Sequence, residues 1–197
     1  YVDLVKDTFP DKEFLTTPMK KEVDRCVLAF EEAMKGKVVS MICSGDAGVY
    51  GMAGLMYEVG VNYSEVELEI VPGVTAALGG AAVLGAPLIH DFCLISLSDL
   101  LTPWEKIEAR LLGASQADFV ICLYNPSSKK RHDYLQKACD LMMQYKSPDT
   151  VCGTVCNIGR EGEEYHLMTL KELRDTQVDM FTTVFIGNSQ KKSTARW

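Results

Sequence analysis

The residues best suited to hold a ligand form a glycine-rich turn that carries a single carboxylate. Ser44, Gly45 and Asp46 follow an apolar run over residues 38–43, and glycine recurs at positions 48, 51 and 54. The turn lacks the Gly-Lys-Ser/Thr of a phosphate-cradling loop and the Gly-x-Gly-x-x-Gly of dinucleotide sites. A carboxylate near a helix N-terminus would also repel phosphate. This chemistry favours a phosphate-free ligand with a cation, hydroxyl groups and an amino acid end, as in S-adenosylmethionine. The alternative is an ordinary strand-to-helix turn in which Asp46 caps the helix.

A second stretch of interest combines a strand exit with a run of very small residues. Thr75 and Ala76 follow Val71-Pro72-Gly73, and glycine and alanine dominate residues 76–87. A helix with so little side-chain bulk lets another helix or a ligand approach its backbone closely. Because Thr75 and Ala76 fall at the carboxyl end of a predicted strand, the ligand interpretation is preferred over helix packing.

Charge limits the partners of the chain. The formal net charge is −7, so a nucleic-acid partner is not expected, because phosphate neutralisation needs a basic surface. One local exception is the run Lys129-Lys130-Arg131-His132. It could grip the carboxylates of an acidic small substrate, or it could be a solvated helix start.

The seven cysteines do not form a recognisable metal or disulfide pattern. There is no Cys-x-x-Cys pair and the count is odd. Cys152 and Cys156 lie four apart on a predicted strand and are interpreted as reduced thiols and not as metal ligands. No metal site is therefore expected, and the reduced thiols favour the cytoplasm. No apolar run is long enough for a membrane span, and no signal peptide is visible.

Apolar patterning predicts the elements that must position these residues. The chain has 197 residues, 47% of them hydrophobic, which is enough for one large domain or two lobes. Strands are predicted over residues 38–43, 66–70, 90–98, 118–124, 150–156, 165–167 and 181–186. Helices alternate with these strands, which indicates an α/β fold with largely parallel pairing. We expect two α/β lobes, over residues 1–105 and 106–197.

Helix boundaries are predicted from capping residues. Thr17-Pro18 is predicted to open an amphipathic helix that ends at Gly36. Thr102 to Glu105 and Thr169 to Glu172 both match the capping-box pattern. The helix that follows Thr102 is predicted to stop at Gly113.

Five segments together resemble the tetrapyrrole methylase family. They are Ser44-Gly-Asp-Ala-Gly-Val-Tyr-Gly51, Val71-Pro-Gly-Val-Thr-Ala-Ala77, Ile95-Ser-Leu-Ser-Asp-Leu-Leu-Thr-Pro-Trp104, Leu123-Tyr-Asn-Pro126 and Asn157-Ile-Gly-Arg-Glu-Gly-Glu163. The resemblance implies two α/β lobes with S-adenosylmethionine in a cleft between them, usually in a homodimer. It is strongest to the members that methylate C17 of precorrin-3B or cobalt-precorrin-3 with ring contraction, in cobalamin biosynthesis. The family's opening strand and Gly-x-Gly-Pro-Gly-Asp loop have no match here, and we expect this chain to start after them.

The same resemblance assigns cofactor-binding residues. It implies that Ser44, Gly45 and Asp46 hold the methionine end and ribose, largely through backbone groups. It further implies that the cofactor is lined by Val49, Thr75 and Ala76, and that its adenine is enclosed by Tyr124, Gly159, Thr182 and Thr183. S-adenosylhomocysteine would be the product.

Ring contraction requires proton movement on the macrocycle, so groups at strand or turn exits are candidate acids and bases. Asp99, His90 and Tyr50 are the candidates, together with Asp91. The many carboxylates of a tetrapyrrole would suit clamping by Lys129, Lys130, Arg131 and Arg160.

Two other functions stay open from the sequence. One is a methylase of the same fold that acts at another tetrapyrrole carbon, or on an RNA or diphthamide-type substrate. The other is a non-catalytic ligand-binding or scaffold lobe.

Overall fold

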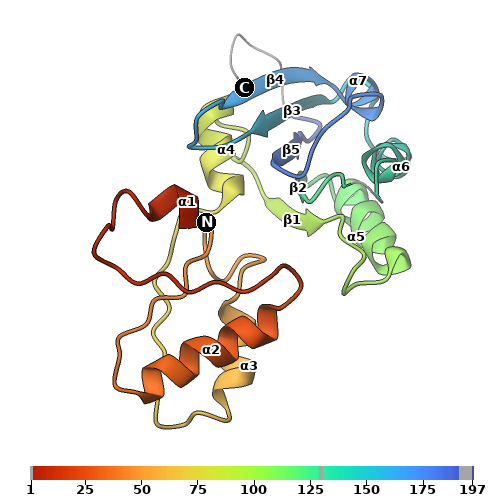
Figure 1. Cartoon of the computed structure of the whole chain (residues 1–197). Coiled ribbons are helices and arrows are strands. Elements are labelled where there is room, and N and C mark those ends of the chain that lie inside the picture. Colours follow the sequence, from red (N-terminus) through yellow and green to blue (C-terminus); the bar gives the residue numbers. More distant parts are fainter. Residues whose placement is uncertain (1, 129–130, 191–196) are drawn as a thin grey trace. The chain divides into compact units, whose positions relative to one another are not determined.

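The computed structural model describes residues 2–128, 131–190 and 197, and the chain divides into two compact units. Unit 1 is Tyr1–Thr75 and unit 2 is Ala76–Trp197 (Figure 1). Residues 76–105, which the sequence pattern places in the first lobe, belong to unit 2. The reason is that strand β1 (Phe92–Ser96) is part of the sheet of unit 2, and helix α4 (Ala76–Leu84) packs on that sheet.

Unit 1 is built around two packed helices, α2 (Glu22–Met34) and α3 (Ala53–Gly60), preceded by the short helix α1 (Val2–Val5). Its core consists of Cys26, Ala29, Phe30 and Met56. The ring of Phe30 also stacks on Tyr63 with 4.9 Å between centroids. Cys26, Ala29 and Phe30 of α2 are therefore buried against α3, whereas Val23 and Met34 of the same helix are exposed.

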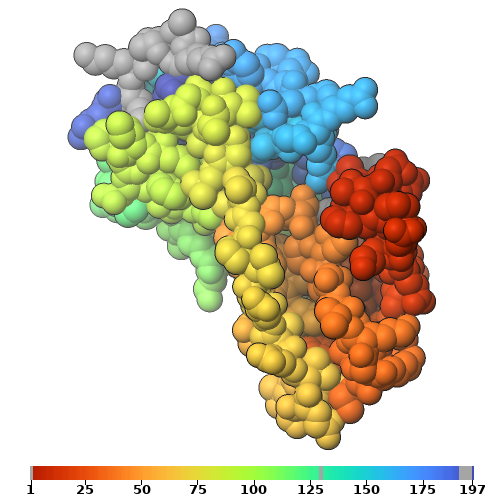
Figure 2. Space-filling model, turned by 90° about the vertical axis from the view of Figure 1, so that its left-hand side faces the viewer, coloured from red at the N-terminus to blue at the C-terminus, as the bar shows by residue number. Residues whose placement is uncertain are grey.

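The strands predicted over residues 38–43 and 66–70 are wrong. A strand needs a backbone partner, and among the described residues neither segment belongs to a ladder. Their apolar side chains are used differently, because Met41, Val66 and Leu68 pack against the α2–α3 core. The two segments and the helices line a groove of about 1000 Å³. Most of residues 64–74 lie exposed at the surface of unit 1 (Figure 2).

Unit 2 contains a five-stranded sheet in the order β1-β2-β5-β3-β4 (Figure 1). Its other strands are β2 (Val120–Tyr124), β3 (Val151–Cys156), β4 (Glu164–Thr169) and β5 (Thr182–Ile186). In this sheet β1 and β2 pair in parallel, whereas β2–β5, β5–β3 and β3–β4 are antiparallel. The prediction of largely parallel pairing is therefore wrong: β3 and β4 form a sequence-adjacent antiparallel pair, and β5 enters between β2 and β3.

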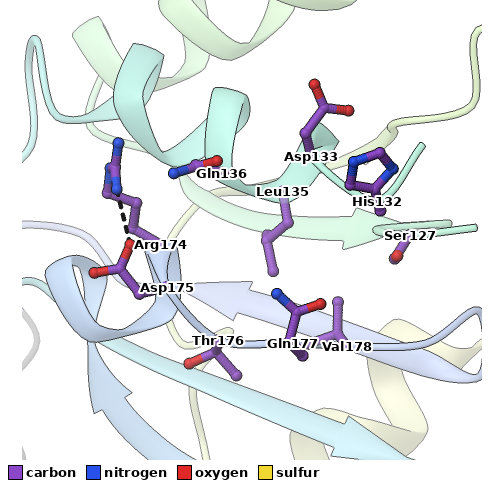
Figure 3. A pocket seen from close by; sticks show the side chains of 10 residues that line it. All are labelled: Ser127, His132, Asp133, Leu135, Gln136, Arg174, Asp175, Thr176, Gln177 and Val178. Carbon is purple, nitrogen blue, oxygen red and sulfur yellow. Dashed lines mark hydrogen bonds and ion pairs between the residues drawn. The ribbon is translucent and has the colours of Figure 1, made fainter.

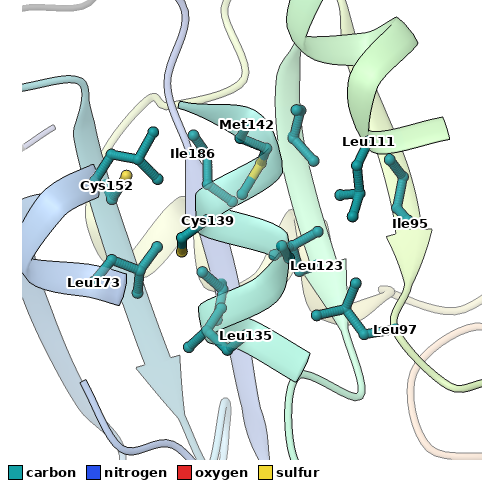
Figure 4. Packing of buried hydrophobic residues seen from close by; sticks show 14 of the residues in the cluster. Ile95, Leu97, Leu111, Leu123, Leu135, Cys139, Met142, Cys152, Leu173 and Ile186 are labelled. Carbon is teal, nitrogen blue, oxygen red and sulfur yellow. The ribbon is translucent and has the colours of Figure 1, made fainter. Parts of the chain in front are cut away.

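Both faces of the central strands β2 and β5 are covered, so these strands are apolar on both sides. Helices α5 (Trp104–Gln116), α6 (Tyr134–Met142) and α7 (Leu170–Arg174) cover one face, where Leu123 and Ile186 point (Figure 4). Helix α4 covers the other face, where Cys122 and Phe185 point.

The helix ends only partly follow the capping predictions. The Thr169–Glu172 capping box is confirmed, with reciprocal hydrogen bonds at the start of α7. Thr102 does not cap α5, whose N-cap is Pro103, and that helix continues past Gly113 to Gln116. Thr17 does not cap α2, which begins at Glu22; its hydroxyl instead accepts a hydrogen bond from Arg25 Nε at 3.0 Å. No helix within the described ranges is both long and apolar enough to cross a bilayer.

Candidate functional site

The carboxylate of Asp46 ties the glycine-rich turn of unit 1 to a second loop. Its Oδ1 accepts a hydrogen bond from Gly48 N at 2.8 Å and its Oδ2 accepts one from Gly73 N at 2.9 Å. The hydrogen bonds from the Gly73 and Gly48 amides lower the pKa of Asp46, so the carboxylate is ionised at neutral pH. Asp46 does not cap helix α3, whose N-cap is Met52. The capping alternative is therefore wrong. Asp46 instead links the glycine-rich turn to the loop that contains Gly73, and we call this link the Asp46 clasp.

Backbone contact between these loops explains two of the glycines. A Cβ on Gly73 would lie 2.3 Å from the carbonyl oxygen of Gly45, so no larger residue fits there. Gly45 itself has a φ of +74°, a conformation that side chains disfavour. The loops present bare main chain, and Ser44, Val49 and Tyr50 flank them, with Tyr50 also at positive φ.

The composition of the segment that contains this clasp suits a cation better than an anion. Residues 38–89 contain no lysine, arginine or histidine but include five acidic residues, Asp46, Glu58, Glu65, Glu67 and Glu69. A sulfonium ligand would therefore meet no repelling side chain from this stretch, whereas a phosphate would find no basic partner in it. This charge distribution fits S-adenosylmethionine.

In unit 2, the predicted site residues gather at one edge of the sheet. Strands β1, β2 and β3 run in the same direction and end at this edge, and β5 begins there. Asp99 follows β1, Tyr124 ends β2, Gly159 follows β3 and Thr182 begins β5. His90 lies before β1, at the opposite edge, so the structure does not bring it together with Asp99.

Tyr124 connects this edge to helix α4. Its hydroxyl oxygen accepts a hydrogen bond from the Ala77 backbone N–H at 2.8 Å, which satisfies a free donor in the first turn of the helix. The small residues of α4 are explained by packing on the sheet. A Cβ on Gly80 would lie 2.8 Å from the Phe185 ring, and Ile158 is almost as close. The close approach along the middle of α4 is therefore made by protein side chains, and the ligand interpretation is limited to Thr75 and Ala76 at its start.

Two other predicted cofactor residues, Gly159 and Thr182, already have hydrogen-bond partners within unit 2. The Gly159 N–H donates to Glu163 Oε2 at 2.7 Å, and the Thr182 hydroxyl donates to Asp179 Oδ1 at 2.8 Å. Thr182 and Thr183 are also buried. These residues can shape a binding surface, but the Gly159 N–H and the Thr182 hydroxyl are committed to holding the strand ends.

Asp99 is the centre of a hydrogen-bonded cluster that the sequence did not reveal. Tyr134 Oη donates to Asp99 Oδ2 at 2.6 Å, and Arg131 Nη1 donates to Asp99 Oδ1 at 3.3 Å and to Ser98 Oγ at 3.0 Å. These donors, Tyr134 first, lower the pKa of Asp99. The Tyr134 ring in turn packs on Trp104, with 4.6 Å between centroids. Asp99 and Arg131 are both predicted site residues, whereas Tyr134 is not among the residues predicted for the site.

Of the predicted clamps, Arg131 lies in this cluster and Arg160 lies in the loop after β3. Lys129 and Lys130 are outside the described residues. A nearby polar depression of about 270 Å³ lies between α6 and the segment after α7 (Figure 3). Its Arg174 is bound by Asp140 at 2.6 Å and by Asp175 at 2.8 Å, so its charge is already neutralised. Within the described ranges no group of three His, Cys, Asp or Glu side chains could hold a metal ion.

Comparison with known proteins identifies a consistent set of relatives. The family model described as Tetrapyrrole (Corrin/Porphyrin) Methylases matches residues 2–174. A probable cobalt-factor III C(17)-methyltransferase from Salmonella typhimurium is 49% identical over 189 residues, which cover 95% of this chain and 78% of that protein. A precorrin-3B C(17)-methyltransferase from Sinorhizobium sp. is 41% identical over 193 residues, covering 95% of this chain and 75% of that protein. Among solved structures, the methyltransferase CobJ superimposes with a TM-score of 0.84 at 35% identity, covering 92% of this chain and 77% of that one.

Proposed function

The chain belongs to the tetrapyrrole methylase family, and we propose that it transfers a methyl group from S-adenosylmethionine to C17 of cobalt-factor III or precorrin-3B, with ring contraction, in cobalamin biosynthesis. The observation that carries this proposal is the 49% identity to a C(17)-methyltransferase over 95% of the chain. The Asp46 clasp and the Asp99 cluster supply polar groups of the kind that this chemistry needs.

S-adenosylmethionine is the methyl donor in this proposal, and when bound it supplies an electrophilic methyl group on a sulfonium. The residues proposed to hold it are Ser44, Gly45, Asp46, Val49, Thr75, Ala76, Tyr124, Gly159, Thr182 and Thr183. The absence of basic side chains from residues 38–89 supports the choice of a cationic ligand.

The residues of the chain act mainly by positioning. Transfer of a methyl group from a sulfonium to carbon removes the positive charge from sulfur. A fixed, dry environment therefore favours methyl transfer more than a strong base does. Asp46 supports this role because it fixes two loops by accepting two backbone hydrogen bonds. Tyr124 supports it because its hydroxyl holds the start of α4.

Asp99 is the residue we propose for proton acceptance during contraction, and Arg131 and Arg160 are proposed to face the carboxylates of the macrocycle. Tyr50 stays a candidate because it lies in the glycine-rich turn at a φ of +54°. His90 is left out, since it lies at the other edge of the sheet. We further propose that the protein acts in the cytoplasm as a homodimer, as the family resemblance implies.

The experiment is a turnover assay with product masses. The purified protein is incubated with S-adenosylmethionine and either metal-free or cobalt-loaded substrate. A product with one more methyl group, placed at C17 by nuclear magnetic resonance, supports the proposal. Methylation at another carbon, or formation of no S-adenosylhomocysteine with either substrate, contradicts it. The two substrates also decide whether cobalt is already in the macrocycle.

A further inference from the structure

Asp99 is held by two side chains from one segment of unit 2 that is distant in sequence. It lies in the loop between β1 and α5, whereas Arg131 and Tyr134 lie just before and at the start of α6. Tyr134 donates to Oδ2 at 2.6 Å and Arg131 donates to Oδ1 at 3.3 Å. Each carboxylate oxygen therefore has one fixed donor, and such charge-assisted bonds are the strong ones.

The rest of the cluster keeps these two donors in place. The Tyr134 ring packs on Trp104 and lies 5.2 Å from Lys137 Nζ. Arg131 is mostly buried, with 14% of its side chain exposed, and it also donates to Ser98. Asn125, which follows β2, donates to Ser96 Oγ at 2.9 Å and so joins the exits of the two parallel strands. The carboxylate is thus attached to a rigid frame.

Asp99 nevertheless remains open to a ligand. Its side chain is 34% exposed, and among the described residues two side-chain donors occupy about half of the roughly four acceptor positions of a carboxylate. The next two residues, Leu100 and Leu101, are 74% and 98% exposed. An oriented acceptor beside exposed apolar side chains suits a substrate with a large, flat ring that must lose a proton.

We propose that Tyr134 is a positioning residue for Asp99, whose carboxylate accepts a proton from an N–H or O–H of the bound macrocycle. This inference rests on the proposed function. The proton passes from the macrocycle to a free lone pair of Asp99 and later to solvent, so no other reactant is needed. Tyr134 keeps its own proton throughout, since its role is to hold the carboxylate and not to titrate.

The pH dependence of turnover gives the sharpest test. Asp99 accepts a proton only while ionised, so activity is present above the pKa of Asp99 and falls as the pH drops through it. Loss of the Tyr134 hydroxyl raises that pKa, so the acid limb of the kcat/KM profile moves to higher pH in Tyr134→Phe. The charged groups that face the pair are Arg131 on Asp99, and Asp133, Lys137 and Arg131 near Tyr134; all of them remain in the variant.

The Phe variant keeps the ring that packs on Trp104, so its fold and its affinity for S-adenosylhomocysteine should match those of the wild type. We expect kcat to fall by about tenfold to a hundredfold, with the acid limb displaced. In an Asp99→Asn background the same substitution should have no further effect. Tyr145→Phe, at an exposed tyrosine outside the cluster, is the matched control and should leave the profile unchanged.

The outcomes separate this inference from the proposed function. An active wild type whose Tyr134→Phe variant keeps the wild-type acid limb overturns the inference alone. An inactive wild type contradicts the proposed function. In that case, an NMR titration of the Asp99 carboxyl carbon still tests whether Tyr134 shifts the pKa of Asp99. The signal is assigned by its loss in Asp99→Asn. An Asp99 pKa that is the same in wild type and Tyr134→Phe overturns the positioning role.

Discussion

Replacement of Lys146 by methionine should destabilise unit 2 strongly, because this buried cation joins two neighbouring strands. Only 2% of the Lys146 side chain is exposed. Its Nζ donates to the carbonyl oxygens of Phe119 and Gly187, both at 2.9 Å. Phe119 precedes β2 and Gly187 follows β5, and these strands pair with each other. Asp118, 3.7 Å from the ammonium, partly balances its charge, whereas burial lowers the pKa of Lys146.

The size of the effect follows from what methionine removes. Each hydrogen bond from a charged donor contributes about 1.5–3 kcal/mol, and both carbonyl oxygens lose this donor. Part of the loss is offset, because the variant no longer has to bury an ammonium group. We therefore expect the free energy of unfolding to fall by about 2–4 kcal/mol. That is a large share of the stability of an ordinary domain.

Equilibrium unfolding in urea, followed by tryptophan fluorescence, measures this change. The chain has two tryptophans, Trp104 and Trp197, and both belong to unit 2, so the signal reports that unit. Lys137→Met is the matched control: Lys137 is 52% exposed and pairs with Asp133 on the surface, and its loss should cost less than about 0.5 kcal/mol. A decrease in the free energy of unfolding below about 1 kcal/mol for Lys146→Met would refute the idea that this cation stabilises the pairing of β2 with β5.

Two further predictions concern unit 1. Gly73→Ala should lower both the melting temperature and the affinity for S-adenosylhomocysteine, because the new Cβ would lie 2.3 Å from the Gly45 carbonyl oxygen. Gly54→Ala, where nothing lies within 4 Å, should lower neither, and equal behaviour of the two variants in calorimetry would contradict the loop contact. Lys35 and Lys37 hold the pKa of Glu32 at about 2, against an ordinary value of 4.5. The stabilisation from a lowered carboxyl pKa is present above the ordinary value and is lost as the pH falls through the folded value. Thermal melts should therefore show wild type more stable than Glu32→Gln near neutral pH, with a gap that closes as the pH falls from 4.5 to about 2; a constant gap would show that the ion pairs contribute nothing.

Local patterns predicted the elements of unit 2 well. Strands β2 and β5 are apolar on both faces because helices cover both sides of the sheet, and such runs are visible in the sequence. The capping box at Thr169 depends on residues three apart, so it could also be recognised. The same local signals failed for residues 38–43 and 66–70, because an apolar pattern does not reveal whether a backbone partner is present. Strand order and direction also depend on distant pairings that no local pattern encodes.

For the candidate site, too, features that depend on neighbouring residues could be predicted, whereas contacts between distant residues could not. The glycine-rich turn was recognisable from its composition, but the role of Asp46 was not, since its partner Gly73 lies 27 residues away. Asp99 and Arg131 were both selected as polar residues, yet nothing in the sequence indicated that they bond to each other. Tyr134 was missed because its helical spacing marks it as a core residue, and its hydroxyl finds Asp99 at a separation of 35 residues.

Calorimetric titration of S-adenosylhomocysteine into the purified protein and its Asp46→Arg variant tests the central claim most directly. Asp46→Arg removes the clasp between the two loops and places a long, charged side chain where the cofactor would bind. Asp11→Arg, with the same charge change at an exposed position of unit 1, serves as the control. The account predicts binding to wild type and to Asp11→Arg, and its loss in Asp46→Arg. Equal affinity in all three proteins, or no binding to the wild type, would contradict it.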